Sequence, residues 1–136
     1  METRTGSCHC GAVRFEVDLD GPIRATECNC SICQRAGYLH VIVDRSAFRL
    51  LQGGDRLRTY TFNTRVAQHR FCSCCGVKSF YVPRSHPDGI SVNGRCLELS
   101  PGERAQIAVR PFDGANWEAN VRELARLEGG SEAEPR

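Results

Sequence analysis

Three groups of closely spaced cysteines constrain this chain more than any other feature of its sequence. They lie at 8–10, 28–33 and 72–75, and they contain eight of the nine cysteines. The first ten residues are polar, and no apolar run approaches the roughly 18 residues that a membrane span needs. We therefore expect a cytoplasmic protein with no membrane segment, where cysteines stay reduced. In that setting, close-set thiols indicate metal ligands, and zinc is the metal that best suits them.

Seven of these cysteines divide naturally into a set of four and a set of three. A structural zinc takes four protein ligands, whereas a catalytic zinc takes three and leaves one position for water or substrate. Gly11 and Gly76 each follow a cysteine, as suits the tight turn of a zinc knuckle. We interpret this division of the cysteines as two bound Zn²⁺ ions. The structural ion has the ligands Cys8, Cys10, Cys72 and Cys75, and the catalytic ion has the ligands Cys28, Cys30 and Cys33.

An alternative hypothesis closes the three-cysteine site with a fourth side chain. The candidates are His9, His40, His69 and Cys74. A closed site would make the chain a non-catalytic zinc module that binds a partner protein. Cys96 stands alone in the sequence and is predicted to be a buried small hydrophobe.

Between the cysteine groups, apolar residues mostly alternate with polar ones. Val13, Phe15 and Val17 show the alternation of a half-buried strand. Further strands are predicted at 39–43, 48–51, 57–62, 78–82, 90–93 and 105–110, and a helix is predicted from Trp117 to about Leu127. The expected fold class is therefore all-β with one C-terminal helix. A single domain is predicted at 1–128, followed by a flexible tail at 129–136.

The charge of the chain argues against a nucleic-acid partner. The formal net charge is +2 when every cysteine is counted as neutral. Seven metal-bound thiolates add seven negative charges and two zinc ions return four positive ones, which leaves a net charge of about −1. No segment interleaves basic and aromatic residues as a base-stacking surface would.

The stretches CHCGAVRFEV, CNCSIC and FCSCCGVKSFYVPR resemble the glutathione-dependent formaldehyde-activating enzyme family. TYTFNT, AQHRFC and SFYVPRSHPDG are most similar to its centromere protein V-like branch, and the likeness covers roughly residues 6–125. The resemblance implies a small zinc-stabilised β-tent domain of two twisted antiparallel sheets. It also implies structural and catalytic zinc ions on the same two sets of cysteines as above.

The activity that the resemblance implies is the joining of formaldehyde and glutathione to give S-hydroxymethylglutathione, formally a carbon–sulfur lyase reaction. Other small carbonyl, thiol-adduct or imine compounds are further candidate substrates. The alternative enzyme is a C=N hydrolase that uses zinc-bound hydroxide. The expected partner is a small molecule such as glutathione, and the chain is expected to be a monomer or a homodimer. Candidate polar residues for positioning the substrate are His40, Asn63, His69, Tyr81 and Arg84, and the alternative for each is a structural or surface role.

Overall fold

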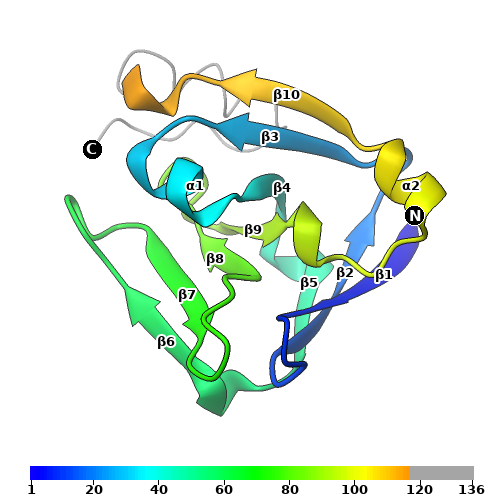
Figure 1. Cartoon of the computed structure of the whole chain (residues 1–136), viewed down its shortest axis with the longest axis horizontal. Helices are drawn as coiled ribbons and strands as arrows, with labels where there is room; N and C mark the ends of the chain where they lie inside the picture. Colours follow the sequence, from blue (N-terminus) through cyan, green and yellow to red (C-terminus); the bar gives the residue numbers. More distant parts are fainter. Residues whose placement is uncertain (117–136) are drawn as a thin grey trace.

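The structure is a computed structural model, and it describes residues 1–116. The predicted helix from Trp117 to Leu127 and the predicted tail at 129–136 lie outside the described residues. Two β-sheets form the framework of the described chain (Figure 1). None of the described helices is long and apolar enough to cross a membrane.

The smaller sheet has three antiparallel strands and the larger sheet has seven strands. The smaller one contains, in spatial order, β1 (Glu2–Ser7), β2 (Arg14–Leu19) and β5 (Phe48–Gln52). The larger one contains, in spatial order, β10 (Ala108–Phe112), β3 (Arg24–Cys28), β4 (Leu39–Asp44), β9 (Gly89–Asn93), β8 (Phe80–Val82), β7 (Gln68–Cys72) and β6 (Leu57–Tyr60). Two short α-helices, α1 (Ser31–Ala36) and α2 (Pro101–Ala105), and the 3₁₀ turns Arg45–Ala47, Gly54–Arg56, Gly94–Cys96 and Gly114–Asn116 connect the strands.

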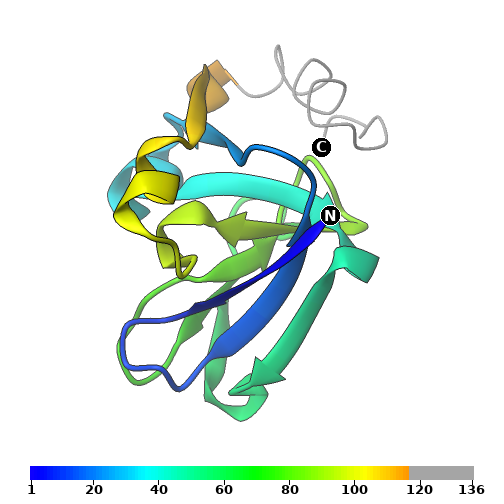
Figure 2. The same ribbon diagram turned by 90° about the vertical axis from the view of Figure 1, so that its right-hand side faces the viewer.

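The core lies between the smaller sheet and one face of the larger one. Phe15 of β2 and Phe80 of β8 are almost completely buried, and their ring centroids lie 6.3 Å apart. Phe48 of β5 contacts both rings, with centroid distances of 5.6 Å and 4.7 Å. In Figure 2 the blue hairpin of β1 and β2 lies across the strands of the larger sheet. The alternation at Val13, Phe15 and Val17 is thus confirmed, since all three side chains are buried.

The opposite face of the larger sheet carries a row of polar and aromatic side chains. Successive paired positions place Tyr60 opposite His69, His69 opposite Tyr81, and Tyr81 opposite Ser91. Directly opposed residues share a face of a sheet, so these four side chains line up across β6, β7, β8 and β9. The strands therefore bury apolar residues on one face and present a chemically different row on the other.

The prediction of wholly antiparallel sheets is wrong at one edge. Strand β10 runs parallel to β3, so that Phe112 is opposite Cys28 (Figure 1). A parallel pair needs a crossover connection, and α2 lies in that connection. The predicted strand at 105–110 consequently begins later, at Ala108. The sequence does contain the signal for α2, because Ser100 and Glu103 form a capping box around Pro101.

Candidate metal centres and cavity

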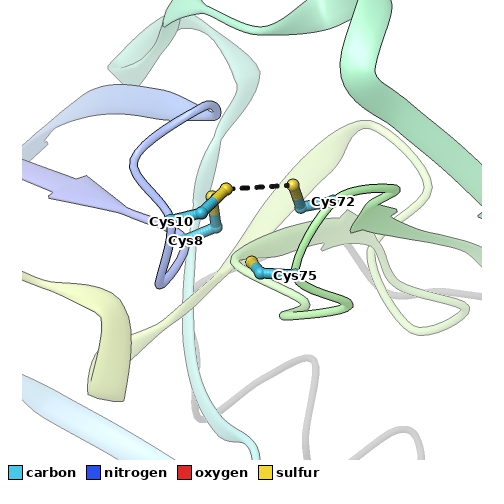
Figure 3. A group of neighbouring side chains, drawn as sticks. All are labelled: Cys8, Cys10, Cys72 and Cys75. Carbon is cyan, nitrogen blue, oxygen red and sulfur yellow. Dashed lines mark hydrogen bonds between the residues drawn. The ribbon is translucent and has the colours of Figure 1, made fainter.

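The four-cysteine group joins two distant parts of the chain. Cys8 and Cys10 lie in the loop between β1 and β2, Cys72 ends β7, and Cys75 lies in the turn that follows (Figure 3). All four sulfurs lie within 4.8 Å of one another. The Sγ atom of Cys10 is 3.7 Å from those of both Cys8 and Cys72. Ligands at 2.3 Å from a tetrahedral zinc are about 3.8 Å apart, so this group fits a zinc ion.

Two turns of similar construction present these four sulfurs. In each, the backbone N–H of the first cysteine donates to the carbonyl five residues ahead, from Cys8 to Val13 at 3.0 Å and from Cys72 to Val77 at 3.1 Å. The glycines after Cys10 and Cys75 have left-handed backbones, with φ of 82° at Gly11 and 77° at Gly76. Side chains rarely adopt this conformation, so the predicted need for glycine in both turns is confirmed.

The three-cysteine group comes from one short segment. Cys28 ends β3, Cys30 caps the N-terminus of α1, and Cys33 lies within that helix. Their sulfurs also lie within 4.8 Å of one another. Two cysteine clusters, one of four residues and one of three, are therefore compatible with two metal ions.

The loop after β10 supports this segment from outside. The Asn29 side chain donates to Asp113 Oδ1 at 3.0 Å and accepts from the backbone N–H of Ala115 at 2.9 Å. Gly114 lies so close that a Cβ atom there would collide with Cys28 Sγ. The loop that follows the parallel strand β10 thus supports the segment that carries the three sulfurs. The sequence pattern did not reveal this contact.

The protonation of the three thiols favours a bound cation. Hydrogen bonds from Cys28, and then from Cys33, lower the pKa of Cys30 to about 2. The hydrogen bond shared with Cys30 raises the pKa of Cys28 to about 11, and bonds to Cys28 and Cys30 raise that of Cys33 further. Without a cation, three crowded sulfurs would hold a single negative charge. A zinc ion allows all three to be thiolates, as metal ligation requires.

His40 of β4 contacts Cys33, which is the buried cysteine of this group. Its Nε2 lies 3.0 Å from Cys33 Sγ, and its Nδ1 lies 3.0 Å from Ser91 Oγ and 3.2 Å from the Tyr81 hydroxyl. Burial lowers the pKa of His40 to about 3, so the ring is neutral. If Nε2 donates to the Cys33 thiolate, Nδ1 accepts from a hydroxyl. This arrangement resembles the outer contacts that orient metal ligands in proteins.

The three sulfurs open onto a cavity of about 550 Å³. This volume falls in the usual range of small-molecule sites. Apolar side chains that include Ile32, Phe62 and Phe112 line much of its wall. The five polar residues predicted from the sequence, His40, Asn63, His69, Tyr81 and Arg84, all line the cavity too. The four-cysteine group does not contribute to this wall.

No alternative fourth ligand joins the three-cysteine group within residues 1–116. Cys74 is exposed and lies 3.2 Å from Arg56. His69 contacts Lys78, and His9 belongs to the loop of the other cysteine group. Cys96 packs against the core as a small hydrophobe, but it is half-buried where the sequence predicted a buried residue.

The fold and the two sulfur clusters define a small β protein with two candidate metal sites, one closed and one open to a cavity. Residues 3–110 match the family described as glutathione-dependent formaldehyde-activating enzyme, and the chain belongs to this family.

Two relatives illustrate the likeness. A protein of Halomonas elongata that carries the same family name is 33% identical over 78 residues, which are 52% of this chain and 50% of the relative. The match therefore spans about half the length of that relative. The crystal structure of a Rhodobacter sphaeroides protein has a TM-score of 0.68 and 36% identity, over 78% of this chain and 99% of that chain.

Proposed function

We propose that this protein is a zinc-dependent enzyme, of the carbon–sulfur lyase type, that acts on small carbonyl, thiol-adduct or imine compounds. Cys28, Cys30 and Cys33 would hold the catalytic ion, and Cys8, Cys10, Cys72 and Cys75 the structural one. The observation that carries the proposal is that the group with only three sulfurs lines the 550 Å³ cavity. An ion held there would keep one position open to substrate, as catalytic zinc does.

Zinc at this position would supply a Lewis acid, which polarises a carbonyl or imine or binds a thiolate. In the family reaction, the thiol sulfur bonds to the carbon of formaldehyde, and the carbonyl oxygen takes the proton that the thiol loses. The product is a hydroxymethyl thioether, and the reverse reaction breaks the same carbon–sulfur bond. His40 would orient Cys33 during this reaction through its contact at 3.0 Å.

The cavity wall supports an imine hydrolase as the second candidate. Among the described residues, Arg84 is the one cationic side chain on this wall, beside apolar residues such as Ile42 and Phe62. Glutathione carries two carboxylates, for which one arginine is a modest complement. A small imine with an apolar substituent suits the same wall, and its hydrolysis adds one water to give a carbonyl compound and an amine.

The proposal further assigns the chain to the centromere protein V-like branch, with small-molecule partners and no nucleic-acid or membrane partner. It places the protein in the cytoplasm, because reduced thiols are required at both sites.

The test measures zinc content and turnover in the same preparations of wild type and C30S. The substrates are formaldehyde with glutathione, and small aliphatic and aromatic imines, with products identified by mass spectrometry. We expect C30S to fold, to lose one of two zinc ions, and to lose turnover of every active substrate. C74S is the matched control, since Cys74 is an exposed cysteine outside both groups, and it should keep both ions and full turnover.

Two results would contradict the proposal. Turnover that survives in C30S after loss of the second ion would remove that ion from the chemistry. Wild-type protein with two ions, each with four protein ligands and no turnover of any substrate, would identify a non-catalytic zinc module instead.

A further inference from the structure

The single lysine of the chain is buried beside the cavity. Lys78 is 9% exposed and lies just before β8, and its Nζ is 3.8 Å from the ring centroid of Tyr81 and 5.0 Å from that of Tyr38. No ion pair with a carboxylate involves Lys78 within the described part of the chain. A buried ammonium without a carboxylate is costly, so its neighbours must explain its presence.

Its hydrogen-bond partner is His69. Nζ of Lys78 lies 2.6 Å from Nδ1 of His69, and both side chains are buried. A protonated lysine has three donors and no acceptor, so Nδ1 must accept in this bond. Burial, and then the Lys78 cation, lower the pKa of His69 to about 4, which keeps the ring neutral. The remaining ring proton is then on Nε2.

The other sides of the His69 ring are covered by aromatic rings. One face stacks on Tyr81, with centroids 4.8 Å apart and an angle of 18°, and Phe62 stacks at 5.3 Å and 23°. His69 lines the cavity, and Nε2 has no hydrogen-bond partner among the described residues. Nε2 nevertheless is not fully buried and retains some accessible surface. Because His69 lines the cavity, this accessible Nε2 edge is the part of the ring that a bound molecule could reach.

We propose that His69 is a hydrogen-bond donor to the substrate, and that Lys78 is the positioning residue that fixes the His69 proton on Nε2. The Nε2–H group would donate to the substrate oxygen or nitrogen that gains electron density when the carbon is attacked. A preorganised donor of this kind is typically worth 10²- to 10³-fold in rate. This inference rests on the proposed function for its substrate, but the proton position at His69 can be measured without turnover.

The direct test is the ¹⁵N NMR spectrum of ¹⁵N-histidine-labelled zinc-loaded protein, because the two ring nitrogens have different shifts in the two neutral tautomers. We expect His69 in wild type to be the neutral Nε2–H tautomer at pH 7, and K78M to lose this preference. An Nδ1–H tautomer or a charged ring in wild type would overturn the inference. This wild-type result stands even if K78M does not fold.

Kinetics then test the donor itself. H69F keeps the stacked ring without a donor, whereas H69Q keeps an N–H group near the position of Nε2. We expect H69F to lower kcat about 100-fold with little change in KM, and H69Q to recover a large part of that loss. Equal kcat in H69F and wild type would overturn the donor role. Absence of turnover in wild type would refute the proposed function, and the tautomer spectrum would still decide the role of Lys78.

Discussion

The two cysteine groups differ in what they connect. The four-cysteine group ties together segments far apart in the sequence, with Cys10 and Cys72 separated by 62 positions. The three-cysteine group lies within residues 28–33 and is held by short-range contacts to α1 and the loop after β10. A metal at the first group would close a long loop, whereas a metal at the second adds little constraint on the chain.

The two groups also differ in their surroundings. Cys8 and Cys72 are buried with the apolar core, while Cys28, Cys30 and Cys33 line the cavity. The same ligand atom can therefore serve stability or reactivity, depending on the number of sulfurs and on what faces the remaining position.

The largest effect on the protein is expected when the four-cysteine group, which forms the closed site, loses a ligand. C72S should prevent stable folding, because binding of a structural zinc supplies roughly 10–16 kcal/mol in small zinc domains. Circular dichroism and thermal unfolding would show this as loss of the cooperative transition. C74S changes a neighbouring exposed cysteine that lies outside the group and should unfold like wild type. A C72S protein as stable as C74S would show that the closed group does not support the fold.

A smaller effect is expected when the loop after β10, which supports the three-cysteine group at the open site, is disturbed. In G114A the new methyl group would collide with Cys28 Sγ. We expect a 10- to 100-fold weaker affinity for the second zinc, which is typical when a contact that orients a metal ligand is lost. The melting temperature should change little. Titration with a competing chelator measures this affinity.

G102A is the matched control, since a Cβ atom at Gly102 in α2 meets only Ser100 Oγ at 4.0 Å. Unchanged affinity in G114A would mean that the loop after β10 does not shape the open group.

The smallest effect concerns the buried Lys78. Burial lowers its pKa from 10.5 to about 8, although the nearby thiolates of Cys33 and Cys30 oppose this. Between these two pH values the unfolded chain binds more protons than the folded one, so stability should rise with pH. The free energy of unfolding of wild type should therefore increase relative to K78M between pH 8 and 10.5, by at most about 3 kcal/mol.

Chemical denaturation of wild type and K78M across this range measures the difference. At pH 7, where the charged lysine is buried, K78M should be at least as stable as wild type. A fall in the relative stability of wild type as the pH rises would mean that the Lys78 pKa is raised, which would contradict the burial of a charged side chain here.

The sequence was most informative where chemistry or strict alternation marks a residue. The division of seven cysteines into four and three matches the clusters in the structure, because ligand spacing and the glycines of the turns are local features. Strands β2, β4, β8 and β9 were found because their apolar residues pack in the core. Strand β1 was missed because it lies at the edge of the smaller sheet and its residues are mostly polar, with no alternation of apolar and polar side chains.

What the sequence could not reveal depends on contacts between distant segments. The parallel pairing of β10 with β3 follows from the crossover through α2. The approach of Gly114 to Cys28, and of Lys78 to His69, follows from sheet order and register. Lys78 is the one lysine among 18 basic residues, the rest being arginine, yet a single lysine carries no periodic pattern that could place it beside a cavity.

Zinc X-ray absorption on the fully loaded protein, combined with its zinc stoichiometry, tests most directly whether one metal site is closed and the other open. Four sulfurs at one ion and three at the other predict two zinc ions per chain with an average of about 3.5 sulfur ligands each. They also predict one lighter ligand that an added thiol replaces, which raises the average towards four. A single ion per chain, or two ions that already have four protein ligands each and do not respond to thiol, would contradict the division into a closed and an open site.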